Sequence, residues 1–381
     1  MKRVAIIGAG ISGLFIANLF KKNLNYQITI YEKNNLTDLD DGYGVQLSVN
    51  SIKLLNKIEF DRVQNKEKFN PKKINFYSNN IFNKICELNI SDFNTENSSY
   101  TTLKRSTLIN FLKKDLEDII KKGYNVSKID QQNQQIKLSF ENNVTIECDC
   151  LIISDGVFSK SKSLISNNQT KLRYNNTLAI RGIINKTLDN IDDQNISLFL
   201  GSNFHYVIYP VNSYGDLNFI AIIKHQLSVE EQKNYSLFTE KSFIEKVLDK
   251  TPLEIKEILN ILKELKIFPI FVSDDIYKPL NSNIYLIGDA FFAFPPSFAQ
   301  GASQSIEAAY DLFKSIENNT ENEFFDKRVK KTKLVNYRSK FNQFTFHLSN
   351  PLITIIRNIF LKKLVKNKKF LESYLGKIYR N

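Results

Sequence analysis

The stretch Met1–Lys33 reads MKRVAIIGAGISGLFIANLFKKNLNYQITIYEK and decides the fold of this chain. The short β-branched apolar run Val4–Ile7 predicts a buried strand, and the run Leu14–Lys22 predicts a helix. A second strand is predicted over Gln27–Tyr31. A strand, a glycine-rich turn, a helix and a second strand in this order are typical of the first unit of a doubly wound α/β sheet.

The turn between the predicted strand and helix is G-A-G-I-S-G, with glycines at positions 8, 10 and 13. Gly8 makes the tight turn, Gly10 lets the backbone approach a pyrophosphate, and Gly13 lets helix and strand pack closely. Glu32 ends the second predicted strand, 19 residues after Gly13, where a carboxylate binds a ribose hydroxyl. The helix N-terminus offers N–H groups to the phosphates. This stretch therefore predicts a dinucleotide site.

Lys2 and Arg3 before an apolar run also resemble the start of a signal peptide. Three glycines inside that run weaken such a helix, and no small-residue cleavage site follows it. The three cysteines, Cys86, Cys148 and Cys150, are too few for a disulfide framework and fit a reducing compartment. The sequence also lacks an apolar run of ~18 residues. We therefore expect a cytoplasmic protein, and no metal site, because the Cys148–Cys150 pair has no matching ligand pair elsewhere.

The composition is that of a globular protein, since 42% of the 381 residues are hydrophobic and 24% are charged. The formal net charge is +12, with local concentrations of lysine at 327–333 and 362–369. This charge reflects either a general lysine-rich bias or attraction to anionic cofactors, substrates or membrane surfaces. Because no recognition motif accompanies it, we expect no nucleic-acid partner.

Four strand-like runs follow one another in the middle of the chain without intervening helices, which favours an antiparallel sheet. They are Leu178–Ile184, Ser197–Leu200, His205–Val211 and Leu217–Lys224. Helices are predicted over Thr102–Lys122, Phe243–Leu265, Ala302–Ser315, Asn322–Leu348 and Ile353–Leu375. Two short apolar runs, Leu151–Ile153 and Ile284–Ile287, resemble further strands of the nucleotide-binding sheet. The antiparallel strands are therefore expected to be an insertion.

Each of these two short apolar runs is followed by an aspartate, Asp155 or Asp289. Ligands of open α/β sheets bind beyond the carboxyl ends of the strands, where an aspartate accepts hydrogen bonds from sugar or ribityl hydroxyls. The alternative is an aspartate that caps a following helix or turn.

Together these motifs resemble the class A flavoprotein aromatic hydroxylases, the family of para-hydroxybenzoate hydroxylase and salicylate hydroxylase. The resemblance covers nearly the whole chain and is carried by Gly8–Gly13 with Glu32, Gly42–Leu47, Lys104–Leu108, Ser154–Ser159, Gly288–Ala290, Pro295-Pro296 and Ala299–Ala302. It implies an α/β fold, with a Rossmann-like FAD-binding (GR2-type) domain, an inserted antiparallel β-sheet substrate domain and C-terminal helices. The FAD-binding residues that it implies are Gly8, Gly10, Ile11, Ser12, Gly13, Glu32, Lys33, Gly44, Gln46, Arg105, Asp155, Gly288, Asp289, Pro296, Gly301 and Ala302.

The resemblance also implies how the chain is divided. A discontinuous FAD-binding domain is expected over 1–72, 101–172 and 270–345. The substrate-binding sheet is expected over 73–100 and 173–269, and a C-terminal helical segment over 346–381.

The implied activity is an NAD(P)H- and O2-dependent monooxygenase that hydroxylates an aromatic or similar electron-rich small molecule through a flavin C4a-hydroperoxide. FAD is the implied cofactor, and NAD(P)H is the co-substrate. Implied substrate contacts are Gln46, Arg181, His205 and Tyr209. His205, Tyr209 and Pro295 are the catalytic candidates, the first two as base or proton relay and Pro295 as a wall of the oxygen-reaction pocket. Their alternatives are ordinary structural roles in the sheet and core.

Three other functions stay open from the sequence. One is a flavin-dependent reductase or dehydrogenase of the same fold, and another is a flavin-binding protein without enzymatic activity. The third is a peripheral membrane hydroxylase of a lipid-tailed quinone precursor. It rests on Ile353–Leu375, where apolar residues alternate with lysines as in helices that lie on anionic membranes.

Overall fold

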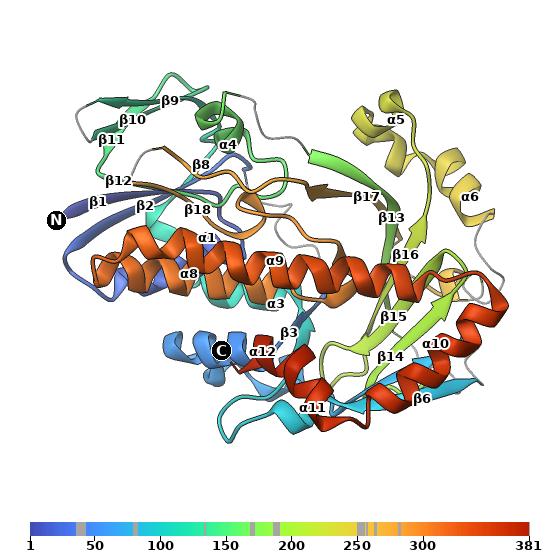
Figure 1. The fold of residues 1–381 in the computed structure, drawn as a ribbon. Coiled ribbons are helices and arrows are strands. Elements are labelled where there is room, and N and C mark those ends of the chain that lie inside the picture. The colour runs from blue at the N-terminus through green and yellow to red at the C-terminus, as the bar shows by residue number, and fades with distance from the viewer. Residues whose placement is uncertain are drawn as a thin grey trace.

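Five parallel strands form the sheet that begins with the N-terminal strand (Figure 1). Their order is β18 (Ile284–Leu286), β12 (Cys150–Ile153), β1 (Lys2–Ile7), β2 (Tyr26–Glu32) and β8 (Ile120–Lys122). The structure is a computed structural model that describes residues 1–35, 43–78, 83–132, 135–167, 172–185, 191–249, 256, 258–262, 265–280 and 283–380. The predicted parallel sheet is confirmed, because β12 pairs with β1 and β18 pairs with β12, all in parallel.

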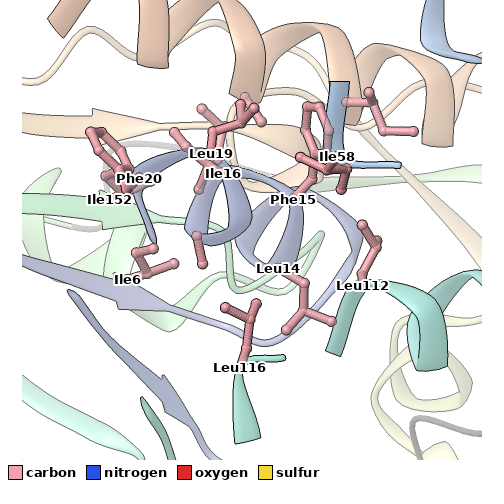
Figure 2. Close-up of a cluster of buried hydrophobic side chains, with 14 of the residues drawn as sticks. Ile6, Leu14, Phe15, Ile16, Leu19, Phe20, Ile58, Leu112, Leu116 and Ile152 are labelled. Carbon is pink, nitrogen blue, oxygen red and sulfur yellow. The ribbon is translucent and has the colours of Figure 1, made fainter. Parts of the chain in front are cut away.

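Helix α1 (Ile11–Lys21) is the centre of the core on one side of this sheet. It is apolar around most of its circumference, and buried side chains cover it from Leu14 to Phe20. Figure 2 shows them between Ile6 and Ile152 of the sheet and Leu112 of α3 (Arg105–Lys113). A helix this apolar is stable only when surrounded. Helix α8 (Gly301–Glu317) also packs on it, and the turn before α1 is therefore held rigidly.

The helix predicted over Thr102–Lys122 is only partly correct. Its first residues form β7 (Thr101–Lys104), α3 occupies the middle, and its last residues form β8. Apolar residues spaced three and four apart fitted a helix throughout, but Ile120–Lys122 pairs with the otherwise open edge of β2. The hydrogen bonds of that edge outweigh a local periodicity that a short strand can also satisfy.

A second, seven-stranded sheet carries the predicted antiparallel strands. Its order is β17 (Lys266–Ser273), β13 (Leu172–Ile184), β16 (Leu217–Lys224), β15 (Phe204–Pro210), β14 (Ile196–Gly201), β5 (Lys73–Tyr77) and β6 (Lys84–Asn89). The pairing is antiparallel except between β14 and β5, which run parallel. Helices α5 (Val229–Lys233) and α6 (Lys241–Asp249) lie on the outer side (Figure 1). The prediction of a helix over Phe243–Leu265 is confirmed for the α6 part, and much of the remainder lies outside the described residues.

Two small sheets complete the strands. One is β11 (Thr145–Cys148), β10 (Gln135–Phe140) and β9 (Val126–Gln132), and the other is β3 (Gly44–Leu47), β7 and β4 (Lys68–Phe69). The short helices are α2 (Val49–Leu55), α4 (Lys160–Ile165) and the 3₁₀ turns η2 (Asn56–Ile58), η3 (Phe60–Arg62), η4 (Asn65–Glu67), η5 (Ile90–Phe93), η6 (Glu117–Ile119), η7 (Tyr235–Thr239), η8 (Gly288–Ala290) and η9 (Pro296–Phe298).

The C-terminal helices cover the inner face of the seven-stranded sheet. Helix α9 (Glu321–Phe346) crosses the molecule beside α8, and α10 (Pro351–Leu364) turns back along β6 (Figure 1). The chain continues through α11 (Lys368–Leu371), the π-helical turn η10 (Glu372–Gly376) and α12 (Lys377–Tyr379). Both helical stretches predicted here are confirmed, although the second is interrupted before Lys368. Among the described helices, none combines the length and the apolar character needed to cross a bilayer.

Candidate active site

The carboxyl ends of β1, β12 and β18 lie side by side, and close backbone approaches connect them. Gly8 has φ +98°, and a Cβ there would lie 2.6 Å from the Ser154 carbonyl oxygen. A Cβ on Gly13 would lie 2.1 Å from the Gly8 oxygen, and one on Gly288 would lie 2.6 Å from Ser12 Oγ. Only glycine fits at these three positions, because a side chain would collide with backbone at Gly8 and Gly13, and Gly288 has φ +62° with Ser12 against it.

Gly10 differs from these glycines, because a Cβ there would meet no described atom within 4 Å. It is the N-cap of α1, and no described side chain caps that end. An open backbone at the start of a buried helix presents N–H groups and the positive end of the helix dipole to an anion. The turn therefore has the form of a pyrophosphate cradle.

Glu32 is 6% exposed, and neighbouring backbone groups orient its carboxylate. Oε2 accepts a hydrogen bond from Ala9 N at 2.9 Å, and Oε1 accepts one from Asn34 N at 3.0 Å. A carboxylate has about four acceptor positions, so both oxygens retain capacity for ribose hydroxyls. Lys33, also predicted to contact the cofactor, is exposed next to it.

Asp155 has the capping role that the sequence offered as an alternative, and its other oxygen stays available for the predicted ligand role. Its Oδ2 accepts a hydrogen bond from Ser161 N in the first turn of α4, at 3.1 Å. Its Oδ1 is buried and has no hydrogen-bond partner among the described residues. A buried acceptor without a donor is costly, so this oxygen is suited to accept a hydrogen bond from a ligand hydroxyl or amide.

The Asp289 side chain is accessible from the cavity, and protein atoms surround it on its other sides. Burial raises the pKa of its carboxyl to about 6, and the Arg105 guanidinium partly opposes that rise. Arg105 begins α3, and its backbone N donates to the Tyr43 carbonyl at 2.7 Å. The structure therefore brings together one acidic and one basic side chain that the sequence assigned separately to the cofactor.

Asp289→Asn is expected to change how the stability of the FAD-free protein depends on pH. The pKa is about 6 in the folded protein and about 4 in an unfolded chain. The protonated form therefore favours folding, a contribution that is complete below about pH 4 and lost as the pH rises through about 6. Thermal midpoints across this window should shift in favour of the Asn variant as the pH rises. Parallel profiles for the two proteins would contradict the raised pKa.

A cavity of about 690 Å³ begins at this point and extends under the seven-stranded sheet. One wall is β3 and the segment 293–302, another is the inner face of the sheet, and the third is formed by α9, α10 and the turns after them. Ten predicted site residues line it: Gly44, Gln46, Arg181, His205, Tyr209, Asp289, Pro295, Pro296, Gly301 and Ala302. Most of the remaining lining is apolar, which is typical of a site for a small organic ligand.

The few polar groups of the cavity gather near β3. Tyr100 Oη donates to Gln46 Oε1 at 2.8 Å. Burial raises the pKa of the Tyr209 phenol, while Arg181 and a hydrogen bond with Gln46 oppose the rise. Asn218 Oδ1 accepts from Gly44 N at 2.6 Å and so attaches β3 to the sheet. Tyr100 was not predicted, because no motif marks a tyrosine at the end of a polar loop.

His205 lies on the same strand as Tyr209, four residues before it. Four residues of extended chain separate their backbones by about 13 Å. His205 Nδ1 and His347 Nε2 are 2.7 Å apart and share one hydrogen bond. Burial and the neighbouring imidazole hold the pKa of His205 well below its usual value, and burial lowers the pKa of His347 to about 4. Of these two imidazoles only that of His205 lines the cavity, and the role of His205 as a base stays a prediction.

Helix α8 directs its N-terminus at the wall nearest Asp289. Gly301 and Ala302 line the cavity, and no described side chain caps the helix. Pro295 and Pro296 precede it, and Ala299 between them and the helix has φ 50°, in the left-handed region. Backbone N–H groups and a positive helix end in this position favour negative charge on a bound ring system. In the described part of the chain, no group of three His, Cys, Asp or Glu side chains could hold a metal ion.

Comparison with known proteins agrees with this geometry. A family model described as an FAD binding domain matches residues 1–323. The chain belongs to this FAD-binding family. A 3-amino-4-hydroxybenzoate 2-monooxygenase of Streptomyces platensis is 21% identical over 317 residues, which are 81% of this chain and 78% of that protein. A salicylate hydroxylase of Pseudomonas putida is 21% identical over 340 residues, which are 82% of this chain and 76% of that protein.

Solved structures of FAD-binding enzymes share the fold. The crystal structure of Klebsiella pneumoniae HpxO with FAD and uric acid has a TM-score of 0.85 at 14% identity, over 99% of this chain and 96% of that one. A salicylate hydroxylase substrate complex has a TM-score of 0.78 at 19% identity, over 100% of this chain and 95% of that one. The predicted FAD-dependent monooxygenase, of the aromatic hydroxylase type, is thereby confirmed.

FAD fits the residues that are present. The open cradle at Gly10 suits its pyrophosphate, Glu32 suits the adenosine ribose, and the unpartnered Asp155 oxygen lies between these groups and the cavity. Asp289 lies where a ribityl chain would lead into the cavity, beside the N-terminus of α8. These residue roles were predicted from the motifs, and the open acceptors and empty backbone surfaces now support them.

Proposed function

We propose that this FAD-dependent monooxygenase uses NAD(P)H and O2 to hydroxylate an electron-rich aromatic substrate with a largely apolar body. The observation that carries the proposal is the cavity, in which Gln46, Tyr100, Arg181 and Tyr209 form one polar end and apolar side chains form most of the rest. Bound FAD supplies hydride acceptance and the activation of oxygen, which amino-acid side chains cannot supply. The protein contributes binding, orientation and exclusion of water.

The polar end is suited to hold a ring hydroxyl. Because its pKa is raised, Tyr209 is protonated at neutral pH and can donate a hydrogen bond to a substrate oxygen. The positive charge of Arg181 nearby favours the phenolate form of such a substrate, which is the more reactive one. The named substrates of three relatives, a hydroxybenzoate, salicylate and 6-hydroxynicotinate, are hydroxylated rings and support this choice.

The pocket wall at Pro295 and Pro296 supports the same proposal. Proline fixes φ near −65° and offers no N–H, so this wall is rigid and free of backbone donors at two positions. The N-terminus of α8 follows and favours negative charge on the reduced cofactor. Together they would keep water from the reacting ring and stabilise the charge that accumulates there.

The test is a screen of phenols and carboxylated aromatics, each with and without an alkyl tail, scored by substrate-stimulated NAD(P)H oxidation. A hydroxylase consumes one O2 per NAD(P)H and incorporates one oxygen atom of O2 into the product. Tyr209→Phe is expected to lower kcat by about 10- to 100-fold and to leave the flavin absorbance unchanged. NAD(P)H oxidation that reduces the substrate without incorporating oxygen would establish the alternative reductase instead.

A further inference from the structure

Helix α10 is mainly apolar, although every one of its 14 residues is exposed or half-buried. A contiguous exposed apolar surface normally marks a site that protein or lipid covers. Its sequence is PLITIIRNIFLKKL, and its three charged residues are Arg357, Lys362 and Lys363. With about 1.5 Å of rise per residue, it is too short to span a bilayer.

The two faces of α10 have different neighbours. Ile353, Ile356 and Phe360 recur at helical spacing and line the cavity. Leu352, Ile355 and Ile359 recur on another face, away from the cavity, and are 72%, 57% and 50% exposed. At 100° per residue, Leu352 and Ile356 are neighbours on the surface. Apolar side chains therefore run without a break from the outside of the protein into the cavity wall.

Lysines extend the outer face in the next turns. Lys362, Lys363 and Lys366 continue the stripe of Leu352, Ile355 and Ile359, and Lys368 and Lys369 follow in α11. All five are exposed. The sequence has no acidic residue between Asp326 and Glu372. An apolar stripe followed by lysines is the pattern of helices that lie in the interface of anionic membranes.

We propose that α10 docks on an anionic lipid bilayer, with Leu352, Ile355 and Ile359 among the acyl chains and the lysines at the headgroups. The cavity wall formed by the same helix is then next to the lipid, where a lipophilic substrate enters without crossing water. The docking depends on α10 and the lysines that follow it, and only the route of the substrate rests on the function proposed above. In Figure 1, α10 lies at the edge of the molecule beside β6, where a flat surface can reach it.

A second copy of the chain is a less suitable occupant of this face. Two-fold dimers bring the same surface of each subunit together. That arrangement would bring the lysines of both copies into or beside one interface, and the neighbouring segment 327–371 has no acidic residue to compensate their charge. Anionic headgroups offer the opposite charge instead.

The test is flotation of the FAD-loaded protein with vesicles of phosphatidylcholine, with and without about 30 mol% phosphatidylglycerol. We expect at least tenfold tighter binding to the anionic vesicles, weakened by salt. The double variant Ile355→Ser with Ile359→Ser should bind at least tenfold more weakly, as should Lys363→Gln with Lys366→Gln. Leu24→Ser, at a leucine that is 84% exposed in the turn after α1, is the matched control and should bind like the wild type.

The outcomes separate docking from catalysis. Turnover of a water-soluble substrate should be unchanged in the Ile355→Ser, Ile359→Ser protein, because neither side chain lines the cavity. The proposal is overturned if the wild type does not float with anionic vesicles, or if Leu24→Ser weakens vesicle binding as much as the α10 variants do. A soluble dimer that the Ile355→Ser, Ile359→Ser variant dissociates also overturns it in favour of a second copy. If the protein binds vesicles but hydroxylates no substrate, only the proposed function is contradicted, and the docking proposal stands.

Discussion

Gly10→Val protein is expected to fold normally and to purify without flavin colour. The backbone at Gly10 is extended, with φ −82° and ψ −175°, which valine adopts readily. A Cβ there would meet no described atom within 4 Å, so the fold accommodates the side chain. The side chain would instead occupy the position where the pyrophosphate approaches the first turn of α1. We expect FAD affinity to fall by about 1,000-fold, or about 4 kcal/mol of binding free energy.

The measurement is flavin absorbance after purification, followed by FAD titration of the protein. Gly13→Ala is the informative comparison, because its Cβ would lie 2.1 Å from the Gly8 carbonyl oxygen. That variant should lose thermal stability even without FAD, whereas Gly10→Val should melt like the FAD-free wild type. If Gly10→Val retained wild-type FAD affinity, the dinucleotide would have to bind elsewhere and the site described here would be wrong.

The two glycines also show how far sequence reasoning could reach. The G-A-G-I-S-G turn and Glu32 lie within one local unit, so strand, helix and acid could be placed from spacing alone. Asp155 required the fold, because its two oxygens have different partners and only one of them is available to a ligand. Sequence could state its two alternative roles but could not show that the capping contact uses one oxygen and leaves the other available.

The features that were missed depend on long-range contacts that no motif marks. Ile120–Lys122 is a strand because β2 has an open edge, and the local periodicity contains no sign of that edge. The parallel pairing of β5 with β14 joins segments more than 100 residues apart. Likewise, Tyr100 enters the site only because its hydroxyl reaches Gln46. Each of these depends on a neighbour that the chain brings close only after folding.

One buried arginine of α9 binds the first turns of α8, the helix that forms the cavity wall next to Asp289. Arg328 is 2% exposed, and its guanidinium donates to Gln304 Oε1 at 3.0 Å, Glu307 Oε1 at 3.0 Å and Asp311 Oδ2 at 3.2 Å. Glu307 also accepts from Asn50 Nδ2 at 2.8 Å, which connects α8 to α2. The network begins one turn after Gly301, so it holds the end of α8 that faces the cavity.

Arg328→Met is therefore expected to destabilise the protein by about 3 kcal/mol, because it removes the buried cation that Glu307 and Asp311 share and leaves them only Lys331 and Lys327. Denaturant unfolding measures the loss. The matched control is Lys327→Met, since Lys327 Nζ contacts the same Asp311 at 2.7 Å but its side chain is 68% exposed, so we expect a loss below about 1 kcal/mol. Adding Asp311→Asn to Arg328→Met should restore part of the stability, because one of the two buried carboxylates that lost Arg328 is then neutral and Glu307 keeps Lys331. Equal losses for the two single variants would show that burial does not set the strength of this network, and that α8 is held by its apolar contacts with α1 instead.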